Sequence, residues 1–417
     1  MNKRMNSTQT NTAKLTSYIF FIVCFVLYSG CMLILFYNQT CAHNDGTFKS
    51  DMEPYLRTML GEESGFEFPY PIFFLLGKFF LMFCDVELAG AIATVVLNSF
   101  SVVVLAYFMH KTLQKYYDKL QCKDWMGVIT CIATLSLFFV AMLFPLDGSI
   151  IEGMEYRYVG VFTPNPFHNA TYIATRPFSI VTFFLFARIL DYYEERSDWK
   201  EFATFGLFLL LSTMTKPSFT LVFVSTAGIL MVFRMITKKW KNFWPSVKLG
   251  VTFIPTFVAL LYQFGGVFGG SLKAGADGGI GIGLASVWKL YTDNIPLAIV
   301  LACAFPLLVL IFHLKELKTN TLYCFSWFQY FISLAELIFL YEKGYRFDHM
   351  NFSWGYMHGI FFVFVVSLII VIRDTISVVI KRERRAVLLM AFWLLYAWHF
   401  SCGVHYFIDI WKGFDYY

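Results

Sequence analysis

Runs of apolar residues long enough to cross a lipid bilayer recur along this chain from residue 18 to residue 408. In the hydrocarbon core a backbone amide finds no water, so a crossing segment has to satisfy its own hydrogen bonds, which favours helices. Of the 417 residues, 58% are hydrophobic and only 15% are charged, far from the composition of an average soluble protein. The short alternating segments of a membrane β-barrel are absent. The sequence therefore predicts an all-α polytopic membrane protein.

The lysines and arginines predict how the chain is threaded. They gather in four clusters, at 111–123, 238–241, 315–318 and 381–385. All four fall on one side of the membrane if the segment 70–83 lies along the outer interface, with Lys78 extending to water, and does not cross. Because positive loops stay inside, this predicts an inner N-terminus, an outer C-terminus and about eleven spans. The spans are expected at 18–37, 86–109, 127–144, 177–191, 202–214, 218–236, 247–265, 295–313, 321–341, 356–373 and 386–408.

We expect one integral-membrane domain over 1–417, with a first outer loop and interfacial helix over 38–85 and a helical bundle over 86–408. The net charge of +5 comes from cations at helix ends, so it does not indicate nucleic-acid binding. Most of the nine cysteines lie in apolar runs or on the cationic side, which gives neither a disulfide framework nor metal-ligand spacing. The Gly-rich stretch 265–283 lacks the pattern of a P-loop.

Polar residues concentrate in the outer segments, beginning with the first loop. This loop carries Asp51, Glu53 and Arg57 just before the interfacial segment, where a lipid headgroup would lie. A carboxylate in that place can act as a general base or hold a divalent cation. For the other acids of the loop, exposure to water is a sufficient explanation.

The outer segment before the fourth expected span reads "NPFHNATYIATRPFS". Arg176 is expected at the start of that span, where a guanidinium can bind a phosphate through paired hydrogen bonds or simply extend to the interface. Lys216, on the short outer turn "TKPS", is compatible with an anion contact and equally with a lysine that only reaches water. The other hydrogen-bonding residues of the segment are Asn165, His168 and Asn169, and the charged residues before them are Glu152, Glu155 and Arg157.

The fourth polar segment is 335–359. Glu336 lies inside an expected span, and an ionisable residue within the membrane marks a functional site by default. Trp354 is a typical interface aromatic, and His399 in the last span is expected to be structural. The densest polar stretch then follows Glu336 and contains Glu342, Arg346, His349 and Asn351.

These features resemble the GT-C class of integral-membrane glycosyltransferases. The resemblance rests on a first helix, an acidic outer loop with "SDMEPYL", an interfacial "YPIFFLLGKFF" and a series of spans with aromatic outer loops. It covers most of the chain. The stretches "NPFHNATYIATRPFS" and "YEKGYRFDHMNFSWGY" are also similar to uncharacterised bacterial membrane proteins of presumed envelope-polysaccharide function.

The resemblance implies transfer of a sugar from a polyprenyl-phosphate-linked donor to an envelope glycan or lipid acceptor at the outer face. Asp51, with Glu53 as the second candidate, would be the catalytic base or a metal ligand. The chain has no adjacent Asp-Asp or Glu-Asp pair, so a divalent cation, Mg²⁺ or Mn²⁺, is a candidate cofactor whose requirement stays open. The residues expected to bind substrate are Arg57, Asn165, His168, Asn169, Arg176, Lys216, Glu342, Arg346, His349 and Asn351.

Two other functions share parts of this pattern. A polymerase or ligase of envelope glycans would use the same outer carboxylates and arginines and would differ mainly in its acceptor. A flippase or transporter of lipid-linked saccharides would show charges within several spans and internal repeats, whereas Glu336 is the main charge within a span and no repeat is visible. In each case the expected location is a bacterial cytoplasmic membrane, with membrane lipids as neighbours.

Overall fold

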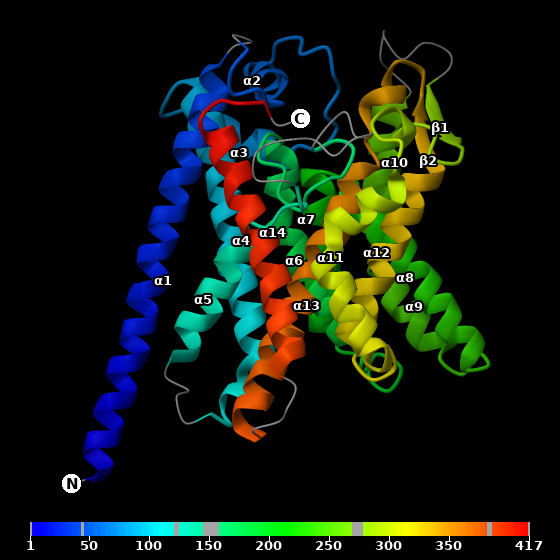
Figure 1. Ribbon diagram of the computed structural model, residues 1–417. Coiled ribbons are helices and arrows are strands. Elements are labelled where there is room, and N and C mark those ends of the chain that lie inside the picture. The colour runs from blue at the N-terminus through cyan, green and yellow to red at the C-terminus, as the bar shows by residue number, and fades with distance from the viewer. Residues whose placement is uncertain are drawn as a thin grey trace.

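The computed structural model describes residues 2–42, 46–120, 125–144, 158–268, 278–381 and 386–415. Long helices stand side by side in one elongated bundle, with helix α1 (Asn2–Cys41) at one edge (Figure 1). The short helix α2 (Met52–Leu60) lies at the end of the bundle opposite the N-terminus (Figure 1). We call the end that carries α2 the upper end, as it stands in Figure 1, and the other the lower end.

The long helices run in alternate directions between the two ends (Figure 1). Those that begin at the upper end are α4 (Val86–Tyr117), α6 (Ala170–Leu190), α8 (Ser218–Thr237), α11 (Ile295–His313) and α13 (Ser353–Lys381). Those that run back toward it are α5 (Met126–Leu137), α7 (Trp199–Thr215), α9 (Phe243–Val251) with α10 (Ile254–Phe268), α12 (Thr321–Phe339) and α14 (Ala386–Trp411). The described members of all four cationic clusters therefore lie at the lower end, as predicted of clusters that share one side; Lys123 and 382–385 lie outside the described residues.

Most of the small elements gather at the upper end (Figure 1). Strands β1 (Gly279–Ile282) and β2 (Leu340–Lys343) form an antiparallel pair in which Gly279 lies opposite Lys343. The other elements there are α3 (Ile72–Leu81) and the 3-10 turns η2 (Trp288–Leu290) and η4 (Gly344–His349), whereas η3 (Leu314–Lys318) follows α11 at the lower end.

Eight helices of the described chain are long and apolar enough to cross a membrane, and α9 with α10 adds a ninth if this pair, bent by 52°, is one span. These helices make the chain an all-α, multi-pass membrane protein. The expected count of eleven is not confirmed, because α5 has only 12 residues and α7 only 17. Helix α3, with 10 residues, is about 15 Å long, too short to cross a core of roughly 30 Å.

The expected span 127–144 leaves the helical conformation at Leu137. Its continuation to Phe144 is almost wholly buried, and two of its backbone amides form hydrogen bonds to neighbouring helices. The amide of Ala141 donates to the carbonyl of His399 at 3.2 Å, and that of Leu143 donates to the carbonyl of Leu301 at 2.8 Å. Irregular backbone at membrane depth is tolerated where protein encloses it in this way.

His399 joins this irregular segment to α11. Its Nδ1 lies 2.7 Å from the carbonyl oxygen of Ala141, and its Nε2 accepts the backbone amide of Phe305 at 3.2 Å. In an unbroken helix that amide would bond to Leu301, but α11 is interrupted at Cys303, where φ is −144° and ψ is 34°. One donor nitrogen and one acceptor nitrogen define a neutral imidazole, so His399 has a structural role here.

Helix α6 begins at Ala170, earlier than the expected 177. The preceding residue, Asn169, is the N-cap, and its Oδ1 accepts the backbone amide of Tyr172 at 2.8 Å. Pro177 lies inside the helix, which membrane helices tolerate. The expectation that Arg176 begins a helix is therefore wrong: it lies nearly two turns inside α6.

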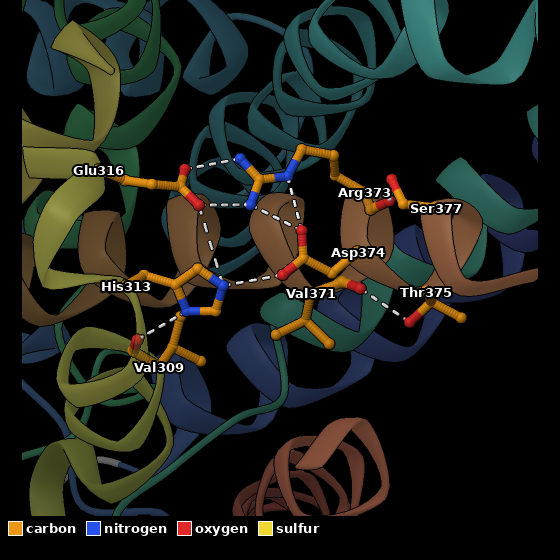
Figure 2. A network of polar contacts seen from close by, with 8 residues as sticks. All are labelled: Val309, His313, Glu316, Val371, Arg373, Asp374, Thr375 and Ser377. Atoms are coloured by element: carbon orange, nitrogen blue, oxygen red, sulfur yellow. Dashed lines mark hydrogen bonds and ion pairs between the residues drawn. The ribbon is translucent and has the colours of Figure 1, made fainter. Parts of the chain in front are cut away.

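At the lower end, four ionisable side chains tie α11 and η3 to α13 (Figure 2). Arg373 donates to both carboxylate oxygens of Glu316 at 2.6 Å and to Asp374 at 2.8 Å. His313 contacts the carbonyl of Val309 at 2.9 Å through Nδ1 and the carboxylate of Asp374 at 2.8 Å through Nε2. Because both partners are acceptors, both nitrogens carry protons and His313 is an imidazolium. Two cations thus face two carboxylates in what we call the lower ion cluster.

Candidate functional site

A cavity of about 760 Å³ lies at the upper end of the bundle, within the size range of small-molecule sites. The first loop, the segment before α6, the α7–α8 turn, α10 and the region around η4 form its walls. These segments are far apart in the sequence, and the fold brings most of the expected site residues together there. The expected residues that line the cavity are Asp51, His168, Asn169, Lys216, Glu342, Arg346, His349 and Asn351.

Asn169 connects the two charged groups at the cavity floor. Its amide nitrogen donates to the carboxylate of Asp51 and, at 3.3 Å, to the hydroxyl of Tyr55. Its amide oxygen accepts from the ammonium of Lys216 at 3.0 Å and from the hydroxyl of Thr171 at 3.0 Å, besides capping α6. An acid and an amine are therefore held on opposite sides of one buried amide.

Lys216 is buried, although it lies on a turn between two helices. Besides Asn169 its ammonium donates to the hydroxyl of Thr171 at 3.2 Å, and it lies 4.3 Å from the centre of the Trp354 ring. Burial lowers the pKa of Lys216 to about 7, and the nearby charge of Asp51 opposes that shift. The third N–H of the ammonium has no hydrogen-bond acceptor among the described residues, and Lys216 is one of the residues that line the cavity.

Asp51 is placed by backbone pairing and by α2. Its amide donates to the carbonyl of His168 at 3.0 Å, which joins the first loop to the segment before α6, and α2 begins at the next residue. One turn into α2, the hydroxyl of Tyr55 lies 3.0 Å from that of Thr171. Burial raises the pKa of Asp51, while Lys216 and the Asn169 hydrogen bond act in the opposite direction. The carboxyl group is thus a stronger base than an exposed aspartate.

Aromatic rings form one side of the cavity. The His168 ring lies 4.8 Å from that of Tyr158 and 5.8 Å from that of Trp354. Burial, together with the charge of Lys216, lowers the pKa of His168 to about 3, so its imidazole is neutral at physiological pH. Sequence reasoning treated Trp354 as an interface aromatic and did not single out Tyr55, whose hydroxyl joins the cluster; no pattern in the sequence marks either as a partner of Lys216 or Asn169.

The rim of the cavity carries the remaining expected polar residues. Asn351 donates to the carboxylate of Glu342, and burial raises the pKa of this carboxyl group. Arg346 is partly buried and donates to the hydroxyl of Tyr345 at 2.9 Å. The partly exposed His349 stands in the same turn, η4. These groups surround the entrance, whereas Lys216 and Asn169 lie deeper.

An apolar wall from α8 and α10 completes the cavity. Phe257 and Leu261 line it, yet 48% and 73% of their surfaces are exposed. The cavity therefore has an exposed apolar surface on this side. Sequence reasoning missed it, although the spacing of the lining residues, Phe257, Leu260, Leu261 and Phe264, follows one face of a helix.

Four expected site residues do not line the cavity. Glu53 and Arg57 form an exposed ion pair at 2.8 Å along α2. Asn165 is buried and donates to the carbonyls at 137 and 140, at 2.9 and 2.8 Å, where α5 ends. Arg176 donates to the carbonyl of Pro164 and lies 5.0–5.6 Å from the centres of the rings of Phe138, Tyr172 and Phe361.

Other expectations fall away from this site. Glu336 of α12 is not among the residues that line the cavity. Glu152, Glu155 and Arg157 lie outside the described residues. Within the described ranges, no three histidine, cysteine, aspartate or glutamate side chains are grouped so as to hold a metal ion.

No protein-family model, no curated protein and no solved structure matches this chain. What supports a function is therefore the chemistry of the cavity itself.

Proposed function

We propose that the protein is a membrane glycosyltransferase of the GT-C type that uses a polyprenyl-phosphate-linked sugar donor. The observation that carries the proposal is the row Asp51–Asn169–Lys216 in a cavity that also has a wall of exposed apolar side chains from α10. A lipid-linked sugar needs a polar site for its headgroup and an apolar path for its chain. The cavity offers both at one end of a membrane bundle.

The lining chemistry fits a sugar phosphate. The aromatic rings around His168 suit the apolar faces of a sugar ring, and carboxylates accept hydrogen bonds from its hydroxyls. The open N–H of Lys216, with Arg346 at the rim, is available for the phosphate. The charged residues that line the cavity are the acids Asp51, Glu67, Glu342 and Asp348 and the cations Lys216 and Arg346.

The transfer needs a base and a stabilised leaving group. Asp51 takes the proton of the acceptor hydroxyl as its oxygen bonds to the anomeric carbon. The bond from that carbon to the phosphate oxygen breaks, and the lipid phosphate leaves with the electron pair. Lys216 stabilises the negative charge that develops on this phosphate.

The acceptor is an envelope glycan or lipid, and a glycan polymerase or ligase would use the same groups with a different acceptor. The location is a bacterial cytoplasmic membrane, with the upper end outside. The lysines gathered at the lower end support this orientation, because loops rich in lysine remain in the cytoplasm.

Transfer assays on the purified full-length protein in lipid nanodiscs test the proposal. Polyprenyl-phosphate sugars with labelled sugar groups serve as donors, and envelope extracts serve as acceptors. Asp51→Asn is expected to lower the transfer rate by about 10²–10⁴-fold, the usual effect of losing a general base. Glu53→Gln is the matched control and should keep full rate, because Glu53 pairs with Arg57 outside the cavity. Equal rates for Asp51→Asn and the unmodified protein would refute the assignment.

A further inference from the structure

We propose that Asn169 is a positioning residue that fixes Asp51 and Lys216 relative to each other and does not itself contact the substrate. The inference rests on the proposed function, in which Asp51 and Lys216 act on the reacting groups. From the sequence, Asn169 was expected to bind substrate. The contacts of its side chain assign it a different role.

The orientation of the Asn169 amide follows from the helix that it caps. The backbone amide of Tyr172 can only donate, so the atom 2.8 Å from it is the amide oxygen. The amide nitrogen is then the atom that faces Asp51, and it can donate to that carboxylate. The side chain of Asn169 therefore both caps the start of α6 and orients the carboxylate of Asp51.

Contacts within the protein use the whole hydrogen-bonding capacity of Asn169. A primary amide has two N–H donors and two lone pairs on oxygen. The donors go to Asp51 and Tyr55, and the oxygen accepts from the backbone at 172, from Thr171 and from Lys216. The residue is also only 2% exposed. A substrate therefore finds no unused group on Asn169.

The partners of Asn169, by contrast, keep unused capacity toward the cavity. Lys216 has its third N–H, and the second carboxylate oxygen of Asp51 accepts no hydrogen bond from any residue that the structure describes. The amide separates the ammonium from the carboxylate and hydrogen-bonds to both. It therefore holds them as two separate ionic groups instead of a direct salt bridge, and each remains free to meet a ligand.

Asn169→Asp tests this arrangement because it keeps a capping oxygen and changes the charge beside Asp51. Aspartate caps a helix as well as asparagine does, so α6 should still form. Two carboxylates then share one site, which raises the pKa of Asp51. We expect the acid limb of the transfer rate, where Asp51 gains a proton, to move up by about one pH unit or more. Asn320→Asp, which changes the N-cap of α12 at the lower end, should leave the profile unmoved.

A second measurement does not depend on any transferase activity. Acetic anhydride modifies only neutral amines, so the pH dependence of Lys216 acetylation, followed by peptide mass spectrometry, reports the charge of Lys216. The half-point should lie near pH 7 in the unmodified protein. In Asn169→Asp the added negative charge should move the Lys216 curve to higher pH, and in Asp51→Asn the lost charge should move it to lower pH.

The outcomes separate the two proposals. If the Lys216 curve moves in both variants but no donor is turned over by any form, the positioning role holds and the proposed function fails. If transfer occurs while Asn169→Asp leaves both the acid limb and the Lys216 curve unmoved, the positioning role is overturned. If Asn169→Asp fails to fold, Asp51→Asn still tests the proposal. An unmoved Lys216 curve in that variant would rule out the coupling between Asp51 and Lys216.

Discussion

Two buried cations near the upper end have different tasks although the sequence suggested the same one for both. Lys216 lies at the cavity with an unused N–H, whereas Arg176 lies among aromatic rings with its guanidinium bonded to a backbone carbonyl. No carboxylate among the described residues contacts Arg176. Its charge is balanced by the carbonyl dipole and the faces of three rings, an arrangement suited to the planar guanidinium.

Arg176→Lys should therefore weaken the fold. Lysine lacks the planar group that stacks on Phe361 and reaches Pro164, so we expect a loss of about 1–3 kcal/mol in the free energy of unfolding. Donor affinity should change little. Unfolding in detergent and donor binding by calorimetry measure the two effects. If Arg176→Lys instead weakened donor affinity and left the stability unchanged, Arg176 would be a contact of the donor phosphate.

Lys216→Met is the opposite case. The substitution removes the only ammonium among the described residues that line the cavity, so donor affinity should fall at least about tenfold, as loss of a charge-assisted hydrogen bond implies. The fold should remain, since methionine is similar in length and suits the ring of Trp354. Binding titrations with donor and with the uncharged polyprenol separate the contributions of headgroup and chain. Unchanged affinity for the charged donor would exclude Lys216 as the anion contact.

Much of this site could be predicted from residue types, and the rest depends on contacts. Asp51, Asn169 and Lys216 were all candidates, because polar residues beside membrane spans are few and conspicuous. Their meeting at one amide could not be predicted, since it depends on the pairing of the Asp51 and His168 segments. The role of Asn165 could not be predicted for the same reason. Its amide donates to the carbonyl of Leu137 at the end of α5, a contact that the sequence does not reveal.

At the scale of single elements, helix ends were harder to predict than helices. The fourth span was expected to begin at residue 177, which is a proline, a residue common in the first turn of a helix. In the fold Asn169 supplies the cap and the proline is accommodated inside α6. The end of α5 at Leu137 was missed for another reason: the apolar run continues, and its non-helical backbone is hydrogen-bonded by Asn165, Leu301 and His399, which lie far away in the sequence.

The lower ion cluster should be the main polar contribution to the packing of α11 on α13. Arg373→Lys replaces a fork onto Glu316 by a single point charge, so we expect a loss of about 1–2 kcal/mol in the free energy of unfolding. Arg188→Lys is the control, because Arg188 pairs with Glu201 while 48% exposed and should contribute less than about 1 kcal/mol. Denaturant titrations of both variants measure these losses. Equal losses of unfolding free energy would show that the lower ion cluster stabilises the fold no more than an exposed ion pair does.

For the whole molecule, the apolar runs were enough to predict an all-α multi-pass membrane protein. They did not predict which segments lie next to each other. Eight of the expected spans correspond to helices long enough to cross, since hydropathy reports burial in lipid directly. The bend between α9 and α10, the short α5 and the strand pair β1–β2 depend on neighbours that lie far away in the sequence.

Sidedness is the prediction that belongs to the whole chain. We expect a cysteine at position 119 or 318 to be labelled only from the cytoplasmic side, and one at 62 or 349 only from outside. The background should lack the nine native cysteines, and an impermeant maleimide applied to intact cells makes the measurement. Labelling of position 119 from outside would show that the orientation in the membrane is the reverse of the one proposed. Labelling of 119 and 349 from the same side would contradict the helix directions in the fold.

The irregular segment after α5 also bears on how the protein is made. Its backbone partners lie on α11 and α14, and the contact between Ala141 and His399 spans 258 residues of chain. A ribosome delivers α5 long before those helices exist, and α5 alone is too short to integrate stably into a bilayer. Residues 126–144 are thus expected to remain without their final packing partners until the last helix has been made. Nascent chains halted before α14 should leave this stretch open to protease, and only release of the full chain should protect it.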